Sequence, residues 1–321
     1  MEKKKIHIAV CLDKGYVMPT GVMMFSVCVN NQDVDIDFHV LIDESVSEKE
    51  QQDLRETLDR FHGKRTLFYS VRSISALCFP LVNFNHLTRA AYYRLFLSDI
   101  LPATIEKVLY LDGDIIVRHS LLLLWDTDLS NHAIGVAIDS NEGKIEKYYR
   151  LRYSYKEGYF NSGVLLINLK YWRDNHIIKE FVEYLNKYPE RIIHEDQDVM
   201  NVVLKDKKLS IPVKYNFQSG FLKKEPGWDY WGYKTEVNAG MKDPVIVHFS
   251  QGWKPWYKNL RYPHPYANTF LKYQSQTKWK NSNYDRRTFR EKIRNVIGNI
   301  LRIIGVKKQV GSPFIDIAPI D

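Results

Sequence analysis

The stretch Val108-Leu109-Tyr110-Leu111-Asp112-Gly113-Asp114 decides the fold of this chain. Its four apolar residues predict a buried strand, and ligands of open α/β sheets bind just beyond the carboxyl ends of such strands. Asp112 and Asp114 project to the same side of an extended backbone, and Gly113 leaves room for close approach. Paired carboxylates suit a hard divalent cation, which in turn can hold a pyrophosphate. For an isolated D-x-D, a plain acidic turn is the alternative.

The sequence around this stretch alternates strands and helices over the first 260 residues. We expect strands at 6–12, 36–42, 66–71, 134–138 and 164–169. We expect helices at 17–29, after the capping-box pair Ser47 and Glu50, and over 88–97, with Thr88 as the cap of the last one. This order predicts an α/β fold with a mixed, mostly parallel sheet and helices on both faces. No Pro/Gly/Ser-rich linker interrupts it, so we expect a domain over 1–265 and an extension over 266–321.

Composition indicates a globular chain in a reducing compartment. Hydrophobic residues make up 45% of the 321 residues, and the three cysteines form no C-x-x-C pair. The apolar run that starts at Ile6 ends at Asp13, which is too short for a signal peptide, and no stretch has the length of a membrane span. These features predict a cytoplasmic protein.

The net charge of +8 is concentrated near the end of the chain. Residues 284–310 hold eight basic residues and two acidic ones, with apolar residues between them at helical spacing. The basic residues are Arg286, Arg287, Arg290, Lys292, Arg294, Arg302, Lys307 and Lys308. A basic amphipathic helix of this kind predicts attachment to an anionic membrane surface, and docking on the protein body is the alternative. No aromatic or Gly-rich module accompanies the charge, so nucleic acid is not an expected partner.

Polar residues that follow other predicted strands are further candidates for the site. Asp13 and Tyr16 follow the first strand, where a nucleotide often lies in such sheets. Arg94 sits on an apolar helix and needs an anionic partner, either a core acid or a substrate phosphate. Asn161 precedes an apolar run and presents either an amide to a site or only a turn.

Two later segments add acids, a histidine and a lysine. Glu195-Asp196-Gln197-Asp198 is compatible with sugar binding and also with acids that favour a helix dipole. His248 ends an apolar run, and an imidazole added to two aspartates gives a mixed site that suits Mn²⁺ better than Ca²⁺. Lys254 follows six residues later and can meet a phosphate as a point charge. A lone histidine at a strand end is otherwise structural.

Together these motifs resemble glycosyltransferase family 8, and most closely its bacterial lipopolysaccharide galactosyl- and glucosyltransferases. The resemblance covers about residues 5–260 in unbroken order, and includes the segments 109–114, 124–126, 159–169 and 196–198 and the pair His248 and Lys254. It implies a GT-A fold and transfer of a hexose from a UDP-sugar to a saccharide acceptor with retention at the anomeric carbon.

The resemblance also implies a role for each candidate residue. Asp112, Asp114 and His248 would hold Mn²⁺ or Mg²⁺. Asp13 and Tyr16 would contact uridine, Gly113 would lie against the nucleotide, and Lys254 would meet the diphosphate. Arg94, Asn161, Asp196 and Gln197 would line the sugar pocket, with Gln197 beside the anomeric carbon.

Retention needs either a carboxylate nucleophile or attack on the same face as the leaving group. Asp196 and Asp198 are candidate carboxylates, whereas Gln197 is a poor nucleophile, which favours same-face attack guided by the departing diphosphate. The aromatic residues Trp228, Tyr230, Trp231 and Tyr233 are compatible with stacking on acceptor sugars or with packing.

Two other classes of protein compete with this interpretation. An aspartate-dependent phosphohydrolase also uses D-x-D after a strand, but Ile116 and the missing G-D-x-x-x-D disfavour it. A non-catalytic nucleotide- or saccharide-binding protein is the second alternative, although a pure binder has no need for acids, His and Lys that converge on a metal and a phosphate.

Overall fold

The computed structural model describes residues 4–71, 89–141, 143–224, 232–258, 262–284 and 312–315. The predicted cap at Thr88, the aromatic residues at 228–231 and the basic residues from Arg286 to Lys308 lie outside these ranges. No helix in the described part of the chain is long and apolar enough to cross a membrane.

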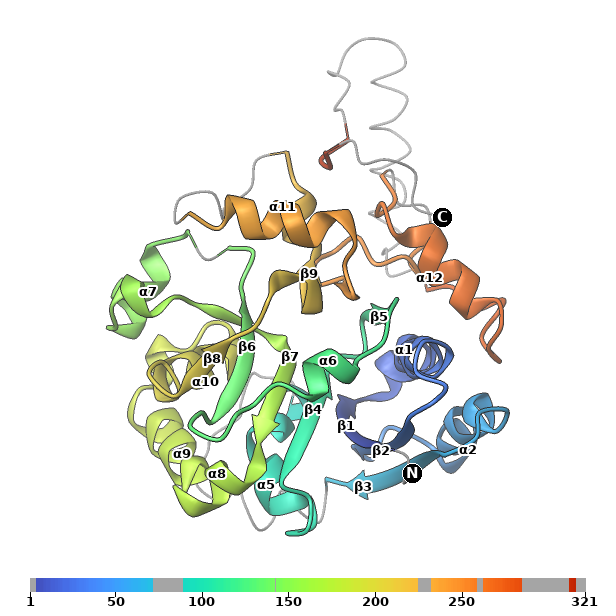
Figure 1. Ribbon diagram of the computed structural model, residues 1–321, viewed down its shortest axis with the longest axis horizontal. Coiled ribbons are helices and arrows are strands. Elements are labelled where there is room, and N and C mark those ends of the chain that lie inside the picture. Colours follow the sequence, from blue (N-terminus) through green and yellow to red (C-terminus); the bar gives the residue numbers. More distant parts are fainter. Residues whose placement is uncertain are drawn as a thin grey trace.

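The fold is built on a seven-stranded sheet with strand order β3-β2-β1-β4-β7-β6-β8 (Figure 1). The strands are β1 (Lys5–Leu12), β2 (Asp35–Ile42), β3 (Lys64–Ser70), β4 (Lys107–Leu111), β6 (Ile134–Ile138), β7 (Phe160–Asn168) and β8 (Lys208–Ser210). Four of the six strand pairs are parallel, and β7 runs antiparallel to both β4 and β6. The predicted mixed, mostly parallel sheet is therefore confirmed.

A second, three-stranded sheet has the order β5-β10-β9. Its strands are β5 (Ile115–Val117), β9 (Phe217–Gln218) and β10 (Ile246–His248). Residues 112–114 connect β4 of the large sheet directly to β5 of the small one. The acidic pair thus lies at the junction of the two sheets.

Helices cover both faces of the large sheet, as predicted (Figure 1). The α-helices are α1 (Val17–Val29), α2 (Glu48–Leu58), α4 (Arg89–Tyr92), α5 (Leu97–Ile100), α6 (Leu122–Trp125), α7 (Glu146–Leu151), α8 (Leu169–Asp174), α9 (Ile177–Lys187), α10 (Glu195–Val203), α11 (Lys234–Lys242) and α12 (Ala267–Gln274). The 3-10 turns are η1 (Lys14–Tyr16), η2 (Tyr93–Phe96), η3 (Tyr155–Glu157), η4 (Pro189–Arg191), η5 (Val213–Tyr215) and η6 (Ser219–Leu222).

Alternating residues of the central strands supply the two cores. Ile8 and Val10 of β1 pack with α1 and α2 on one face, whereas Ala9 of β1 and Tyr110 of β4 pack with α8, α9 and α10 on the other. The predicted capping box is present, because Ser47 and Glu50 exchange hydrogen bonds at the start of α2.

Two local predictions differ from the structure. The helix expected over 88–97 is divided in its described part into α4, η2 and α5. The strand expected from residue 164 begins at Phe160, so Asn161 lies inside β7 and not in a preceding turn. The first residue of β7, Phe160, pairs with Ile138 at the end of β6, and this pairing lengthens β7 at its N-terminal end.

The chain after residue 265 packs on the body in two described places. Tyr273 of α12 shares a hydrogen bond with Asn30, and the ring of Trp279 lies against Gly21 of α1. Farther along, Phe314 is 3% exposed and joins a core cluster with Phe249 and Trp256. Residues on the two sides of the predicted boundary at 265/266 therefore pack against each other, and the division into 1–265 and 266–321 stays a prediction.

Candidate active site

The two aspartates are held by backbone hydrogen bonds from both sheets. The N–H of Asp112 donates to the carbonyl of Gly163 in β7 at 2.8 Å, and the N–H of Phe249, after β10, donates to the carbonyl of Asp114 at 2.9 Å. The Tyr110 hydroxyl also donates to Asp112 Oδ1 at 2.9 Å. These bonds place the acidic pair at the carboxyl end of β4, as the sequence predicts, and also beside the end of β10.

Asp112, Asp114 and His248 form a cluster that fits a divalent metal. One ligand atom from each lies within 4.8 Å of the others. His248 Nε2 is 3.3 Å from Asp114 Oδ1 and 3.7 Å from Asp112 Oδ2. On the other side of the ring, His248 Nδ1 shares a hydrogen bond of 3.0 Å with Asn216 Oδ1. That partner orients the ring and leaves Nε2 available as a ligand, which is the usual outer-shell arrangement of a metal-bound histidine.

Gly163 allows this cluster to form, because the imidazole and the Asp112 carboxylate occupy the space beside its Cα. A Cβ at this position would lie 2.7 Å from Asp112 Oδ2 and 2.8 Å from His248 Nδ1. Both distances are shorter than side chains tolerate. The glycine is therefore a requirement of the site and not of a turn.

Asp114 is buried, yet it is held in its ionised form. Burial alone would raise its pKa, but the charges of Lys254 and His248 outweigh this effect and hold the pKa well below its usual range. Lys254 is itself 8% exposed and donates to Asp114 Oδ2 and to the carbonyl of Phe249. Lys254 thus lies beside the candidate metal ligands, and its predicted contact with a diphosphate stays a prediction.

Arg94 connects the metal ligands with the acidic segment at the start of α10. Its Nη1 is 3.0 Å from Asp112 Oδ1, and its Nε is 3.4 Å from Asp196 Oδ2. Burial opposes the charge of Arg94, whereas these two acids raise its pKa well above the ordinary range. Burial also raises the pKa of Asp196 to about 7, against the opposing charge of Arg94. The partner predicted for Arg94 is therefore a pair of acids within the site.

A cavity of about 200 Å³ lies on one side of this arginine. It is lined by Cys11, Leu12, Asp13, Tyr16, Ala91, Arg94, Asp112, Gly113 and Asp114. The structure thus brings the predicted nucleotide residues to one place next to the acidic pair. The side chain of Asp13 is oriented by the turn that follows it, because its Oδ1 accepts a hydrogen bond of 2.7 Å from the N–H of Gly15.

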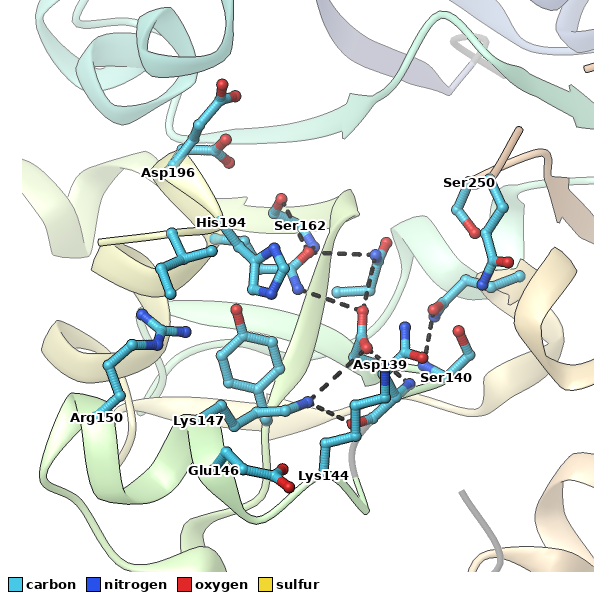
Figure 2. Close-up of a pocket in the computed structure, with 18 residues that line it drawn as sticks. Asp139, Ser140, Lys144, Glu146, Lys147, Arg150, Ser162, His194, Asp196 and Ser250 are labelled. Carbon is cyan, nitrogen blue, oxygen red and sulfur yellow. Dashed lines mark hydrogen bonds and ion pairs between the residues drawn. The ribbon is translucent and has the colours of Figure 1, made fainter. Parts of the chain in front are cut away.

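A second cavity, of about 760 Å³, lies beyond Asp196 (Figure 2). Asn161, Asp196 and Gln197 line it together with Asp139, and Lys144, Lys147 and Arg150 line the side formed by α7 and the residues before it. Asp196 Oδ2 is buried and has no regular hydrogen-bond partner among the described residues, and its nearest charged neighbour is Arg94, at 3.4 Å.

Asp139 and Gln197 form the polar floor of the second cavity. The Gln197 amide donates to Asp139 Oδ2 at 3.2 Å, and its Oε1 accepts from the N–H of Ser162 at 3.0 Å. Asn161 donates to the same Asp139 oxygen at 3.2 Å and accepts from Asn216 at 2.9 Å. One network of side-chain amides therefore runs from Gln197 to Asn216, the partner of His248.

Asp139 and Asn216 are absent from the sequence-based candidates. Asp139 directly follows the predicted strand 134–138, in the same way as Asp112 follows its strand. An acid at the end of a predicted strand is therefore the sequence signal that could have identified it. Asn216 lies between two short elements and has no comparable signal. Its role depends on the small sheet, whose pairing the sequence does not reveal.

Asp198 differs from its neighbours, because its carboxylate points away from the cavities. It binds Arg150 at 2.7 and 3.1 Å, accepts from the Tyr159 hydroxyl at 2.7 Å, and accepts from the N–H groups of Ile193 and His194. It is fully buried and does not line either cavity. These contacts hold the loop before α10 and leave no lone pair facing a substrate.

Comparison with known proteins agrees with this geometry. The family model of glycosyl transferase family 8 matches residues 7–259. The chain belongs to glycosyltransferase family 8. It is similar to general stress protein A of Bacillus subtilis, with 29% identity over 87% of this chain and 96% of that protein. It is also similar to lipopolysaccharide 1,3-galactosyltransferase of Salmonella typhimurium, with 30% identity over 86% of this chain and 79% of that enzyme.

A solved structure shares the fold of this family 8 chain. The galactosyltransferase LgtC, in complex with donor and acceptor sugar analogs, matches with a TM-score of 0.71 and 28% identity over 85% of this chain and 96% of that one. The GT-A fold and the assignment as a glycosyltransferase are therefore confirmed, and the phosphohydrolase and non-catalytic alternatives are not favoured.

Proposed function

We propose that this glycosyltransferase moves a hexose, galactose or glucose, from a UDP-sugar to a saccharide acceptor, with retention at the anomeric carbon, in the synthesis of lipopolysaccharide or another cell-surface glycan. The observation that carries the proposal is the cluster of Asp112, Asp114 and His248 beside Lys254, between two cavities. The similarity to a lipopolysaccharide galactosyltransferase supports the substrate class.

The donor would lie across both cavities. Asp13 and Tyr16 would contact uridine in the smaller cavity, and the diphosphate would lie at the acidic pair. Mn²⁺ or Mg²⁺, held by the two aspartates and His248, supplies positive charge that balances the diphosphate as it leaves. The mixed N/O ligand set favours Mn²⁺. Lys254 has three N–H donors, of which the described structure uses two, and the third would meet a phosphate oxygen.

The hexose would enter the larger cavity beside Gln197. Arg94, Asn161 and Asp196 would bind its hydroxyl groups, and Asp139 would hold the Gln197 amide in place. We assign Asp198 a positioning role, because all of its described contacts are internal. With Asp198 so occupied and Gln197 a poor nucleophile, same-face attack by the acceptor remains the favoured route to retention.

Isothermal titration of UDP into metal-stripped protein, with and without Mn²⁺, tests the proposal. We expect binding that requires Mn²⁺ and is lost in Asp114→Ala, while the circular dichroism spectrum of the variant stays native. Binding that is indifferent to the metal would overturn the metal–diphosphate site. A screen of UDP-sugars for Mn²⁺-dependent hydrolysis would then identify the donor.

We further propose that the basic segment 284–310 binds the anionic inner face of the cell membrane, which would bring the enzyme to a lipid-linked acceptor. Replacing its eight basic residues by Gln should abolish sedimentation with phosphatidylglycerol vesicles. The same variant should bind UDP normally. Substitution is a cleaner test than deletion of 284–321, because deletion would also remove the buried Phe314. Undiminished vesicle binding would refute the membrane role.

A further inference from the structure

Lys254 lies at the end of a loop that has few contacts of its own. The loop leaves β10 at His248 and runs through Phe249 to Lys254. A Cβ on Gly252 would have no atom within 4 Å, so the centre of the loop faces open space. Apart from the hydrogen bonds of its own ammonium to Asp114 and Phe249, Lys254 is therefore held in place through the aromatic residues at the two ends of the loop.

Trp253, which directly precedes Lys254, packs against a residue from the far end of the chain. Its ring lies 4.9 Å from the ring of Phe314, at an angle of 65°. Phe314 also contacts the ring of His264 at 5.5 Å, and His264 stacks edge-on against Phe249 at 4.7 Å. Phe314 thus touches the Trp253 end of the loop directly and the Phe249 end through His264.

Backbone hydrogen bonds hold Phe314 in this position. The N–H of Ile315 donates to the carbonyl of Leu222 at 2.8 Å, and the N–H of Lys224 donates to the carbonyl of Pro313 at 3.0 Å. Residues 312–315 are therefore paired with residues 222–224 and are not merely placed against the loop. The family model ends at residue 259, so nothing in the family match accounts for this segment.

The downstream side of the loop is held in a similar way. The N–H of Tyr284 donates to the carbonyl of Trp256 at 2.9 Å, and the N–H of Lys258 donates to the carbonyl of Tyr284 at 3.0 Å. The chain thus contacts the lysine loop immediately before residue 285 and again after residue 311. Two separate contacts from the C-terminal part of the chain converge on one loop of the site.

We propose that Phe314 is a positioning residue for the diphosphate lysine: the C-terminal segment 312–315 completes the donor site by holding Trp253, and thereby Lys254, beside Asp114. This inference rests on the proposed role of Lys254 toward a diphosphate. Removing the Phe314 ring would leave Trp253, among the described residues, with only the ammonium of Lys223 over its ring and allow the loop to move. We expect weaker binding only of ligands that carry a diphosphate. The proposed uridine contacts, Asp13 and Tyr16, lie between β1 and α1 and not on this loop.

The experiment compares UDP with uridine, which lacks the diphosphate, by titration into the full chain in the presence of Mn²⁺. Phe314→Ala should weaken UDP binding about tenfold, a typical coupling for residues in contact, and leave uridine binding unchanged. Phe314→Leu, which keeps most of the apolar volume, should recover much of the loss. Leu185→Ala, a large-to-small change in the core beside α9, controls for general destabilisation and should alter neither affinity.

A double-mutant cycle tests whether Phe314 acts through Lys254. In a Lys254→Met background, Phe314→Ala should have little further effect on UDP binding. Equal losses for UDP and uridine, or an unchanged UDP affinity in folded Phe314→Ala and Phe314→Leu proteins, would overturn the inference. A wild-type protein that binds UDP no better than uridine would instead overturn the proposed function itself.

Discussion

Gly163→Ala is the smallest substitution that tests the metal site directly. The added Cβ would lie 2.7 Å from Asp112 Oδ2 and 2.8 Å from His248 Nδ1, whereas ordinary contacts begin at 3.4 Å. The Asp112 oxygen must therefore move by about 0.7 Å, and the imidazole of His248 must move farther, because its Cε1 is the atom nearest to the added Cβ. Both shifts exceed the tolerance of about 0.2 Å on metal–ligand distances. The backbone of Gly163 needs no glycine, because its φ is not positive, so the effect is confined to the space beside it.

We expect the Gly163→Ala variant to lose Mn²⁺ affinity by about 100-fold or more, since changes in partners outside the ligand set alone cost 10–100-fold. Overpacking should lower the free energy of unfolding by about 1–3 kcal/mol, which leaves a folded protein. Mn²⁺ affinity is measured by electron paramagnetic resonance, and stability by urea denaturation. Gly135→Ala in β6 is the matched control, because its Cβ meets no atom closer than 3.3 Å. Normal Mn²⁺ binding by Gly163→Ala would refute the assignment of His248 and Asp112 as ligands.

Three further predictions concern stability. Arg150→Met leaves the fully buried Asp198 without its ion-pair partner and should lower the free energy of unfolding by about 3 kcal/mol in urea denaturation; a loss below about 0.5 kcal/mol would contradict the structural role of this pair. Burial lowers the pKa of His264 to about 3, from an ordinary value of 6.5. The unfolded chain therefore binds a proton that the folded chain excludes, and stability is lost as the pH falls from 6.5 toward 3. Relative to His264→Phe, the wild type should lose up to about 1.4 kcal/mol per pH unit in this range, and parallel stability–pH curves would show that His264 is not buried as described. Gly21→Ala places a Cβ 2.5 Å from Cη2 of Trp279 and closer still to its Cζ3, and should destabilise the fold by about 1–3 kcal/mol with a shift in tryptophan emission; an unchanged spectrum would place Trp279 elsewhere.

The sequence predicts the large sheet well because its strands carry local signals. The helix at 17–29 and the strand at 134–138 have the predicted bounds. The ends of β1 and β4 bring Asp13 and Asp112 to one cavity. Prediction fails where an element depends on distant partners. The helix over 88–97 is broken where Arg94 turns toward its two acids, and β7 is longer than its apolar pattern because β6 pairs with it.

The residues of the candidate site also divide into those with a local sequence signal and those whose position depends on distant contacts. Asp112, Asp114 and His248 could be named from the sequence, because each lies at the end of an apolar run. Lys254 could be named from its position six residues after His248. Asp198 shows the limit of this reasoning. It shares a segment with Asp196 and Gln197, but two positions on a helix differ by about 200° in direction, so Asp196 and Asp198 point to opposite sides. Only the positions of Arg150 and Tyr159 decide which acid faces the cavity.

The spacing of the acidic pair has a structural cause beyond metal binding. Asp112 directly follows β4 of the large sheet and Asp114 directly precedes β5 of the small one, so Gly113 alone separates the two acids at the junction of the sheets. His248 arrives from β10, which pairs with β5, and its ring is oriented by Asn216 beside β9. Each proposed ligand therefore depends on how the two sheets meet, and Gly163 of β7 sets how closely they approach. A metal bound here would tie the sheets together at the point where the donor cavity opens. The same junction receives Lys254 through a loop that Phe314 supports. The precision of the site thus comes from contacts between sheets and from the end of the chain, and not from the D-x-D motif alone.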